Sequence, residues 1–459
     1  MFDCPQNLRE EEMFEVPEWA ANKVVYQIFP SRFAATEPVD KELWYKAPIT
    51  PMDDLHGNLR GIIEHMDDIQ NLGIDVLYMT PIFQSNSCHK YDTTDYYQID
   101  PSFGTTEDLK ELVQKAHERG MKVVLDAVYN HTGREFFAFA DILENGEKSK
   151  YRDWYFIDGF PLKSEWGEIP NFKCFGYYGG MPKLNLKNPE VEKYITDVAC
   201  YWIKECDIDG WRLDVGDEIS HFFWKNFRKA VKAVKKDMLI IGEIWHYAGD
   251  FLEGDEWDTV MNYPFYLNLI DLLADEKITV SQFVQNLGYL KGRLHKNCYP
   301  LMWNLIDSHD TARFLHLCND NKKKQHLAAA FQLLLPGMPM IYYGDEYAMP
   351  GANDPDCRRG MYWDEEYQDK EMYEWYKRLI QVRKSHACIV EGELAGSVTE
   401  DEEGTIVLIR KNGEETIAMI FNCSSSAKKF NEYTQKYNLL TENTFDGNVE
   451  GVDAAVIVL

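Results

Sequence analysis

Four short segments of the sequence combine acidic residues with histidine, arginine or tryptophan directly after an apolar run. They read DAVYNH at residues 126–131, DGWRLDVGDE at 209–218, GEIW at 242–245 and IDSHD at 306–310. Cleavage of a glycosidic bond needs one carboxylate that attacks the sugar and one carboxyl group that protonates the departing oxygen. We therefore expect this chemistry from Asp214, Glu243 and Asp310.

The spacing around Asp214 suggests how the roles divide. Arg212 lies two residues earlier, so strand alternation puts both side chains on the same face. A guanidinium there would keep Asp214 ionised, which suits a nucleophile, and leaves Glu243 as the carboxyl group with the raised pKa. The alternative is a structural network of ion pairs, which also perturbs pKa values.

Eight short apolar runs must position these residues. They cover residues 24–29, 76–80, 123–128, 210–214, 239–243, 259–263, 301–306 and 340–343. Amphipathic stretches lie between several of them, and those at residues 59–73 and 106–120 each close on a glycine, as helices often do. The alternation predicts an α/β fold, a (β/α)8 TIM barrel, in which the carboxyl ends of the strands converge on one mouth.

Two further units are expected beside the barrel. The connection after the third run is long, aromatic and weakly periodic, so we interpret residues 131–184 as an inserted lobe. Residues 1–130 and 185–384 then form the barrel. From residue 385 to 459 the apolar residues alternate, which predicts a small antiparallel β domain.

Composition restricts the partners. The 459 residues carry a formal net charge of -28, which disfavours nucleic acid and anionic lipid and leaves a neutral ligand as the expectation. Ten cysteines show no metal-binding spacing, and no stretch resembles a leader or a membrane span. We expect a cytoplasmic protein with no cofactor.

In order and spacing, the four segments resemble the strand-end motifs of the α-amylase family of glycoside hydrolases. The resemblance covers about residues 24–383 and implies Asp214 as nucleophile, Glu243 as general acid/base and Asp310 as the carboxylate that distorts and holds the sugar. It also implies that His131, Arg212, His309 and Tyr91 surround that sugar. Trp245 joins this substrate-binding set, although Trp245, Tyr91 and Tyr263 could instead be core aromatics.

A narrower resemblance comes from MPKLN at residues 181–185, GEIWH at 242–246 and GDEYAMPGANDPDCRRGMYWD at 344–364. These are similar to the neopullulanase, cyclomaltodextrinase and maltogenic amylase group. The similarity implies that Asp354 and Arg358 grip the next sugar, with a surface ion pair as the alternative. The group's N-terminal β-sandwich domain is missing before the first run, so we expect a monomer. FAATEPVD and HGN offer too few oxygen ligands for calcium, so no metal is expected.

The residues leave the outcome of the reaction open. If water completes the displacement, the protein is a retaining hydrolase of α-1,4-glucosidic bonds in maltooligosaccharides, with cyclodextrins and pullulan as further substrates. If a sugar hydroxyl completes it, the same residues make a 4-α-glucanotransferase. A noncatalytic glucan-binding protein is the remaining alternative, and retention of all three carboxylates argues against it.

Overall fold

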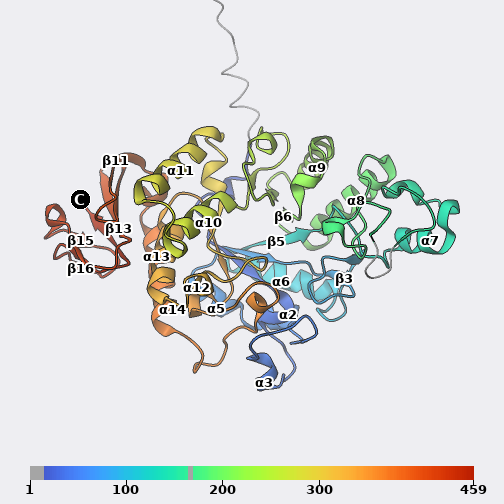
Figure 1. Cartoon of the computed structure of the whole chain (residues 1–459), viewed down its shortest axis with the longest axis horizontal. Helices are drawn as coiled ribbons and strands as arrows, with labels where there is room; N and C mark the ends of the chain where they lie inside the picture. Colours follow the sequence, from blue (N-terminus) through green and yellow to red (C-terminus); the bar gives the residue numbers. More distant parts are fainter. Residues whose placement is uncertain (1–14, 164–168) are drawn as a thin grey trace, which may run out of the picture.

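The computed structural model describes residues 15–163 and 169–459, and it confirms the predicted barrel (Figure 1). Eight parallel strands form one sheet in the order β8-β7-β6-β5-β2-β1-β10-β9. A parallel bridge from Met261 to Trp303 joins the two edge strands and closes the sheet. The strands are β1 (Val25–Ile28), β2 (Val76–Met79), β5 (Lys122–Ala127), β6 (Gly210–Leu213), β7 (Leu239–Gly242), β8 (Thr259–Val260), β9 (Trp303–Leu305) and β10 (Met338–Tyr342).

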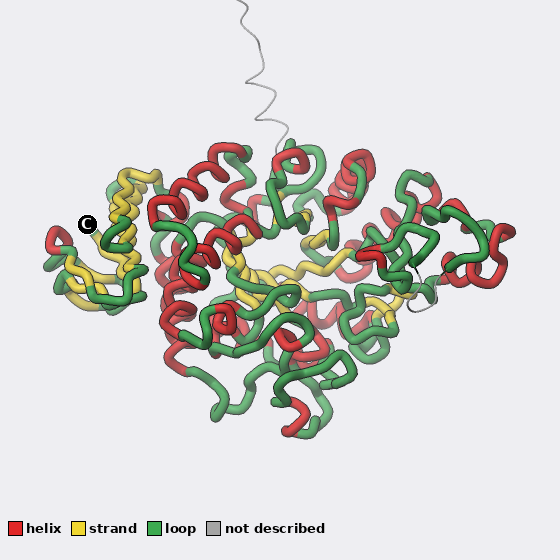
Figure 2. Tube along the Cα trace, viewed as in Figure 1, coloured by secondary structure: helices red, strands yellow, loops and turns green. Residues whose placement is uncertain are grey.

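Helices surround the sheet, so that nearly every strand residue is buried on both faces (Figure 2). The longer ones are α4 (Leu59–Glu64), α5 (Met66–Leu72), α6 (Thr106–Glu118), α8 (Pro189–Cys206), α9 (His221–Val234), α10 (Tyr263–Leu269), α11 (Val280–Arg293), α13 (Lys322–Leu334) and α14 (Lys370–Ser385). Short helices are α2 (Pro30–Phe33), α3 (Lys41–Trp44), α12 (Phe314–Leu317) and α15 (Cys388–Glu391). None of the helices in the described ranges is both long and apolar enough to cross a membrane.

Local signals explain most helix ends. Thr105 and Asp108 form a capping box at the start of α6, and Gly73 ends α5 with a φ of 101°. The stretch predicted as one helix over residues 59–73 is divided into α4 and α5 at His65. The imidazole of His65 stacks on Trp363 at 3.6 Å, a contact from a distant part of the chain.

The segment after β5 extends from one end of the barrel and carries α7 (Phe137–Asn145) (Figure 1). A bridge from His131 to Lys183 joins the two ends of this segment, and a bridge from Tyr155 to Leu184 joins its middle to its C-terminal end. Nearby, β3 (Phe83–Ser85) and β4 (Thr93–Ile99) form a separate hairpin. A division into a barrel and a lobe at residues 131–184 remains our proposal, and these bridges support it.

The predicted antiparallel β structure forms at the opposite end of the molecule (Figure 1). Its sheet has the order β11-β12-β13-β18-β15-β16, from β11 (Glu393–Glu400), β12 (Thr405–Asn412), β13 (Glu415–Asn422), β18 (Asp453–Val458), β15 (Tyr437–Asn438) and β16 (Asn443–Thr444). A second pair joins β14 (Lys428–Lys429) to β17 (Asn448–Val449). Residues of β13 alternate between two cores: Phe421 stacks on Phe331 of α13, while Ile420 packs with Phe430 on the other face.

Candidate active site

Three strand ends bring the predicted carboxylates to one mouth. Asp214 and Glu243 directly follow β6 and β7, and Asp310 lies a few residues beyond β9. Asp214 and Glu243 are 6% and 7% exposed, whereas the side chain of Asp310 is 29% exposed. Two carboxylates therefore lie at the bottom of the mouth, and the third lies nearer to its opening.

Arg212 connects this cluster. Its guanidinium is fully buried, and Nη1 donates to both oxygens of Asp126, at 3.1 and 3.0 Å, and to Asp214 Oδ1 at 3.2 Å. The other terminal nitrogen, Nη2, lies 2.9 Å from Glu243 Oε2 and 3.9 Å from Asp310 Oδ2. One guanidinium thus lies within 4 Å of four carboxylates, which are on β5, directly after β6, directly after β7 and in the loop after β9.

This sharing changes the expected electrostatics. Burial, followed by the charge of Glu243, raises the pKa of Asp214 well above its ordinary value, although Arg212 opposes the shift. Burial also raises the pKa of Glu243, and it raises that of Asp126 to about 6. Arg212 lowers the pKa of Asp214, as expected, but its effect is smaller than that of burial and the charge of Glu243. Its single charge is divided among several carboxylates, so burial and mutual repulsion raise the pKa of Asp214, Glu243 and Asp126 in spite of Arg212.

Glu243 and Asp214 differ in their hydrogen bonds. Glu243 Oε2 accepts the backbone N–H of Val215 at 2.9 Å, and Oε1 accepts the indole N–H of Trp245 at 3.2 Å. Asp214 Oδ2 is buried and has no hydrogen-bond partner among the described residues. One oxygen of Asp214 is therefore left uncommitted at the site.

The backbone beside Asp214 is strained. Val215 has a φ of 48° and a ψ of 42°, a left-handed conformation that is costly for a β-branched residue. In this conformation its N–H points at Glu243. The strained conformation of Val215 thus directs a backbone N–H that holds the carboxyl group of Glu243 next to Asp214.

Tyr91 and His309 form one wall of the site. The two rings are parallel within 6°, with centroids 5.5 Å apart, and the Tyr91 hydroxyl donates to Asp126 Oδ2 at 3.0 Å. Tyr91 O–H also contacts His309 Nε2. Burial, together with nearby Arg358 and Arg212, lowers the pKa of His309 well below its usual range, so its imidazole is neutral.

His131 lies behind Tyr91. It is 1% exposed, its Nε2–H donates to the Tyr91 carbonyl at 3.0 Å, and its ring stacks on Phe175 at 5.2 Å. Burial lowers the pKa of His131 to about 4. This histidine therefore holds the backbone of Tyr91 in place.

Arg358 and Asp354 extend the site from the mouth outward. Arg358 donates through Nε to the His309 carbonyl at 2.8 Å, and its Nη1 lies 2.8 Å from Asp354 Oδ1. Its Nη2 lies 3.5 Å from Asp310 Oδ1. The side chain of Asp354 is 49% exposed, whereas that of Arg358 is 9% exposed. The arginine of this ion pair is therefore held inside the protein, and the carboxylate is accessible to a ligand.

Trp245 is at the surface rather than in the core. It is 42% exposed, and its ring stacks on Tyr263 with centroids 4.0 Å apart and planes at 14°. Tyr263, by contrast, is fully buried. The indole therefore presents an open aromatic face beside Glu243, supported by a buried aromatic ring.

Two residues were missed from the sequence. The Tyr78 hydroxyl on β2 donates to Asp126 Oδ2 at 2.7 Å, and Gln27 Nε2 on β1 lies 2.7 Å from His309 Nδ1. Both are polar residues inside apolar strands, which is the signal that would have found them. Within the described ranges, no group of three or more His, Cys, Asp or Glu side chains is arranged to hold a metal ion.

Comparison with known proteins agrees with this architecture. Residues 27–392 match the family described as Alpha amylase, catalytic domain. A cyclomaltodextrinase from Geobacillus thermopakistaniensis (strain MAS1) is 46% identical over 428 residues, covering 92% of this chain and 72% of the relative. An intracellular maltogenic amylase from Bacillus subtilis is 42% identical over 420 residues, covering 90% and 71%.

A solved structure is also similar along its whole length. The cyclic α-maltosyl-(1→6)-maltose hydrolase from Arthrobacter globiformis, in complex with cyclic α-maltosyl-(1→6)-maltose, superposes with a TM-score of 0.88 at 35% identity. The match covers 97% of this chain and 100% of that one. The resemblance inferred from the four strand-end segments is confirmed, and the chain belongs to the α-amylase family of glycoside hydrolases.

Proposed function

We propose that this protein is a retaining glycoside hydrolase that cleaves α-1,4-glucosidic bonds in maltooligosaccharides and related α-glucans. The observation that carries the proposal is the cluster around Arg212, in which Asp214, with one buried oxygen that has no hydrogen-bond partner among the described residues, lies beside Glu243 on the same guanidinium. Such a pair can supply both the nucleophile and the proton that double displacement requires.

In the first step, Asp214 Oδ2 attacks the anomeric carbon of the bound sugar. The bond to the departing glycosidic oxygen breaks, and that oxygen takes the proton of Glu243. In the second step, Glu243, now a carboxylate, removes a proton from water, whose oxygen displaces Asp214 from the sugar. Arg212 stabilises whichever carboxylate is ionised at each stage, and Asp310 and Arg358 are positioned to bind sugar hydroxyls at the opening.

The substrate class follows from the relatives together with the open mouth. Their names point to cyclic and linear maltodextrins, and the exposed face of Trp245 offers a platform for a sugar ring on the side of Glu243. We infer that short α-glucans, linear or cyclic, are the substrates, with pullulan as a further one. A 4-α-glucanotransferase is the second candidate, because an exposed aromatic platform beside the acid/base can also hold an acceptor sugar.

One experiment tests the reaction. The protein is incubated with maltoheptaose while reducing ends, product sizes and the anomeric proton signals are followed over time. Hydrolysis with retention gives new reducing ends in the α configuration and products shorter than the substrate. A β anomer formed first would refute the double displacement, and products longer than maltoheptaose without new reducing ends would identify the glucanotransferase.

The remaining expectations concern the protein's surroundings. We propose an intracellular, monomeric protein that does not bind nucleic acid. The named intracellular relative, the cysteines of the described ranges, which occur as free thiols, and the net charge of -28 support this proposal. Light scattering at micromolar concentration tests the monomer, and a stable dimer would contradict it.

A further inference from the structure

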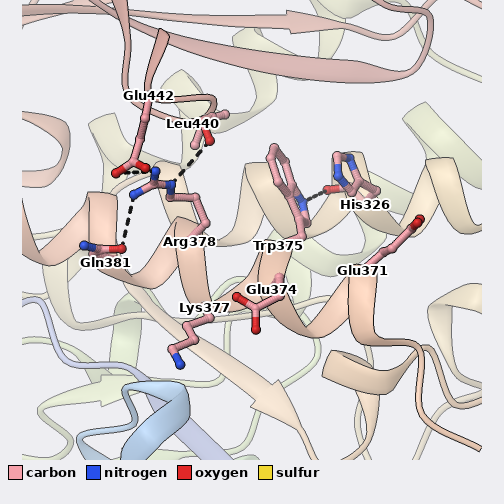
Figure 3. A pocket seen from close by; sticks show the side chains of 9 residues that line it. All are labelled: His326, Glu371, Glu374, Trp375, Lys377, Arg378, Gln381, Leu440 and Glu442. Carbon is pink, nitrogen blue, oxygen red and sulfur yellow. Dashed lines mark hydrogen bonds and ion pairs between the residues drawn. The ribbon is translucent and has the colours of Figure 1, made fainter.

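A hollow of about 500 Å³ lies away from the carboxylate cluster, between α14 and the C-terminal β structure (Figure 3). Its walls come from α14, from His326 of α13, and from the turn that carries Leu440 and Glu442. None of the residues assigned above to the active site lines it. Its volume lies within the range that small-molecule sites occupy in proteins.

A second hollow, of about 320 Å³, continues the first. The two share His326 and Glu371, and the second is bounded by residues 450–453 of the C-terminal β structure. They follow one another along the junction between the barrel helices and the terminal sheet. We refer to the two hollows together as the junction groove, and because they adjoin at His326 and Glu371, an extended ligand could occupy both.

Trp375 is the central side chain of the junction groove. Its indole N–H donates to the His326 carbonyl at 2.8 Å, and the His326 ring stacks on it with centroids 3.7 Å apart and planes at 11°. The indole is half-buried and lines the hollow with the surface that remains. Because its orientation is fixed before any ligand arrives, little entropy is lost when a ring packs against it.

Hydrogen-bonding groups surround Trp375 on both sides. Arg378 lies on one side, where it is paired with Glu442 at 2.5 Å, donates to Gln381 Oε1 at 3.2 Å and is held by the Leu440 carbonyl (Figure 3). The carboxylates of Glu371 and Glu374 are exposed at the rim. These planar groups are of the kind that bind pairs of neighbouring hydroxyls.

The charged side chains that line the junction groove limit the class of ligand that it can bind. Acidic and basic side chains are both present, and two of the basic ones are already paired, Arg378 with Glu442 and Lys322 with Asp369. Burial lowers the pKa of His326 to about 4, so its imidazole is neutral near pH 7. Acidic side chains outnumber basic ones in the lining of the two hollows, so the groove disfavours polyanions. It suits a neutral, hydroxyl-rich chain with apolar ring faces.

We propose that the junction groove is a second binding site for α-glucan chains, separate from the active site. The identity of the sugar rests on the proposed function, whereas the groove itself does not. A polymer held there would remain attached while the mouth releases one product and takes another segment. The benefit would be confined to long substrates, because a short oligosaccharide cannot occupy both places.

Binding stoichiometry tests the proposal. In a Glu243→Gln background, which prevents turnover, calorimetric titration with maltohexaose should give two sites per chain. Adding Trp375→Ala should leave one, and adding Phe222→Ala, an aromatic that is 66% exposed on α9, should leave two. If Trp375→Ala impairs folding, the paired rim substitution Glu371→Ala with Glu374→Ala replaces it and should weaken the second site at least about fivefold.

Activity provides an independent measurement. In the protein with Glu243 intact, Trp375→Ala should lower kcat/KM for amylose at least about threefold and leave kcat/KM for maltotriose unchanged. A single maltohexaose site before any groove substitution, or two sites after Trp375→Ala, would overturn the proposal. Failure of the parent protein to hydrolyse any maltooligosaccharide would instead refute the proposed function and leave the stoichiometry to be judged separately.

Discussion

Replacing Trp245 with phenylalanine removes one hydrogen bond from Glu243 and keeps an aromatic ring on Tyr263. Hydrogen bonds to charged groups contribute about 1.5–3 kcal/mol. This one is 3.2 Å long and its donor is 42% exposed, so we assign it about 1 kcal/mol, below that range. Since 1.36 kcal/mol corresponds to one pKa unit, the expected shift is about 0.7 unit.

The direction follows from which form the bond stabilises. The indole N–H binds the ionised carboxylate, so its loss raises the pKa of Glu243 further. Glu243 must be protonated to act as the acid, and a higher pKa keeps it protonated to higher pH. We therefore expect the basic limb of the kcat/KM profile for maltotriose to move upward by about 0.7 pH unit.

The control is Trp375→Phe, which removes the same indole donor from a backbone carbonyl in the junction groove. It should leave the pH profile for maltotriose unchanged. A basic limb that stays in place or moves to lower pH in Trp245→Phe would refute the reasoning, because Trp245 would then not act on Glu243 through this bond.

Three further predictions concern the nucleophile, the barrel and metal ions. The Asp214→Asn variant should retain the fold, since the two side chains are of equal size. It should keep less than about 1% of turnover, because an amide cannot form the covalent intermediate. Higher residual activity in a single-turnover assay would reject Asp214 as the nucleophile. Burial alone would raise the pKa of Asp209, but hydrogen bonds from His117 and Lys122 and the charge of Lys235 lower it well below its usual value. Its stabilising effect is therefore present above about pH 4 and lost as the pH falls through the lowered value. In urea denaturation at pH 7, Asp209→Asn should lower the free energy of unfolding by about 3–5 kcal/mol, and a loss that is equal at pH 2 would contradict this origin. EDTA should leave the melting temperature unchanged, whereas a fall of several degrees would reveal a metal site.

The sequence was sufficient for the barrel because strand runs and the residues that follow them are local patterns. All eight predicted strands form, and Asp214, Glu243 and Arg212 meet at one mouth as strand alternation requires. The roles given to these side chains stay predictions until the variants are measured.

The features that the sequence did not predict depend on contacts between segments that are distant in the chain. The break at His65 coincides with stacking on Trp363, almost 300 residues later, and no helix signal near His65 announces it. The two-residue strands β14 and β17 are too short to show an alternating pattern. The sharing of one guanidinium among four carboxylates arises only when the barrel closes, so the raised pKa of Asp214 was not foreseen.

The position of Arg212 also has a consequence for how this site can change through mutation. Asp126, Asp214, Glu243 and Asp310 all lie within 4 Å of the same guanidinium, so removing any one of them redistributes its charge over the other three. The effects of single substitutions at these positions will therefore not sum in double variants. Evolution of the site is epistatic, and libraries that vary one carboxylate at a time would miss combinations that work only together.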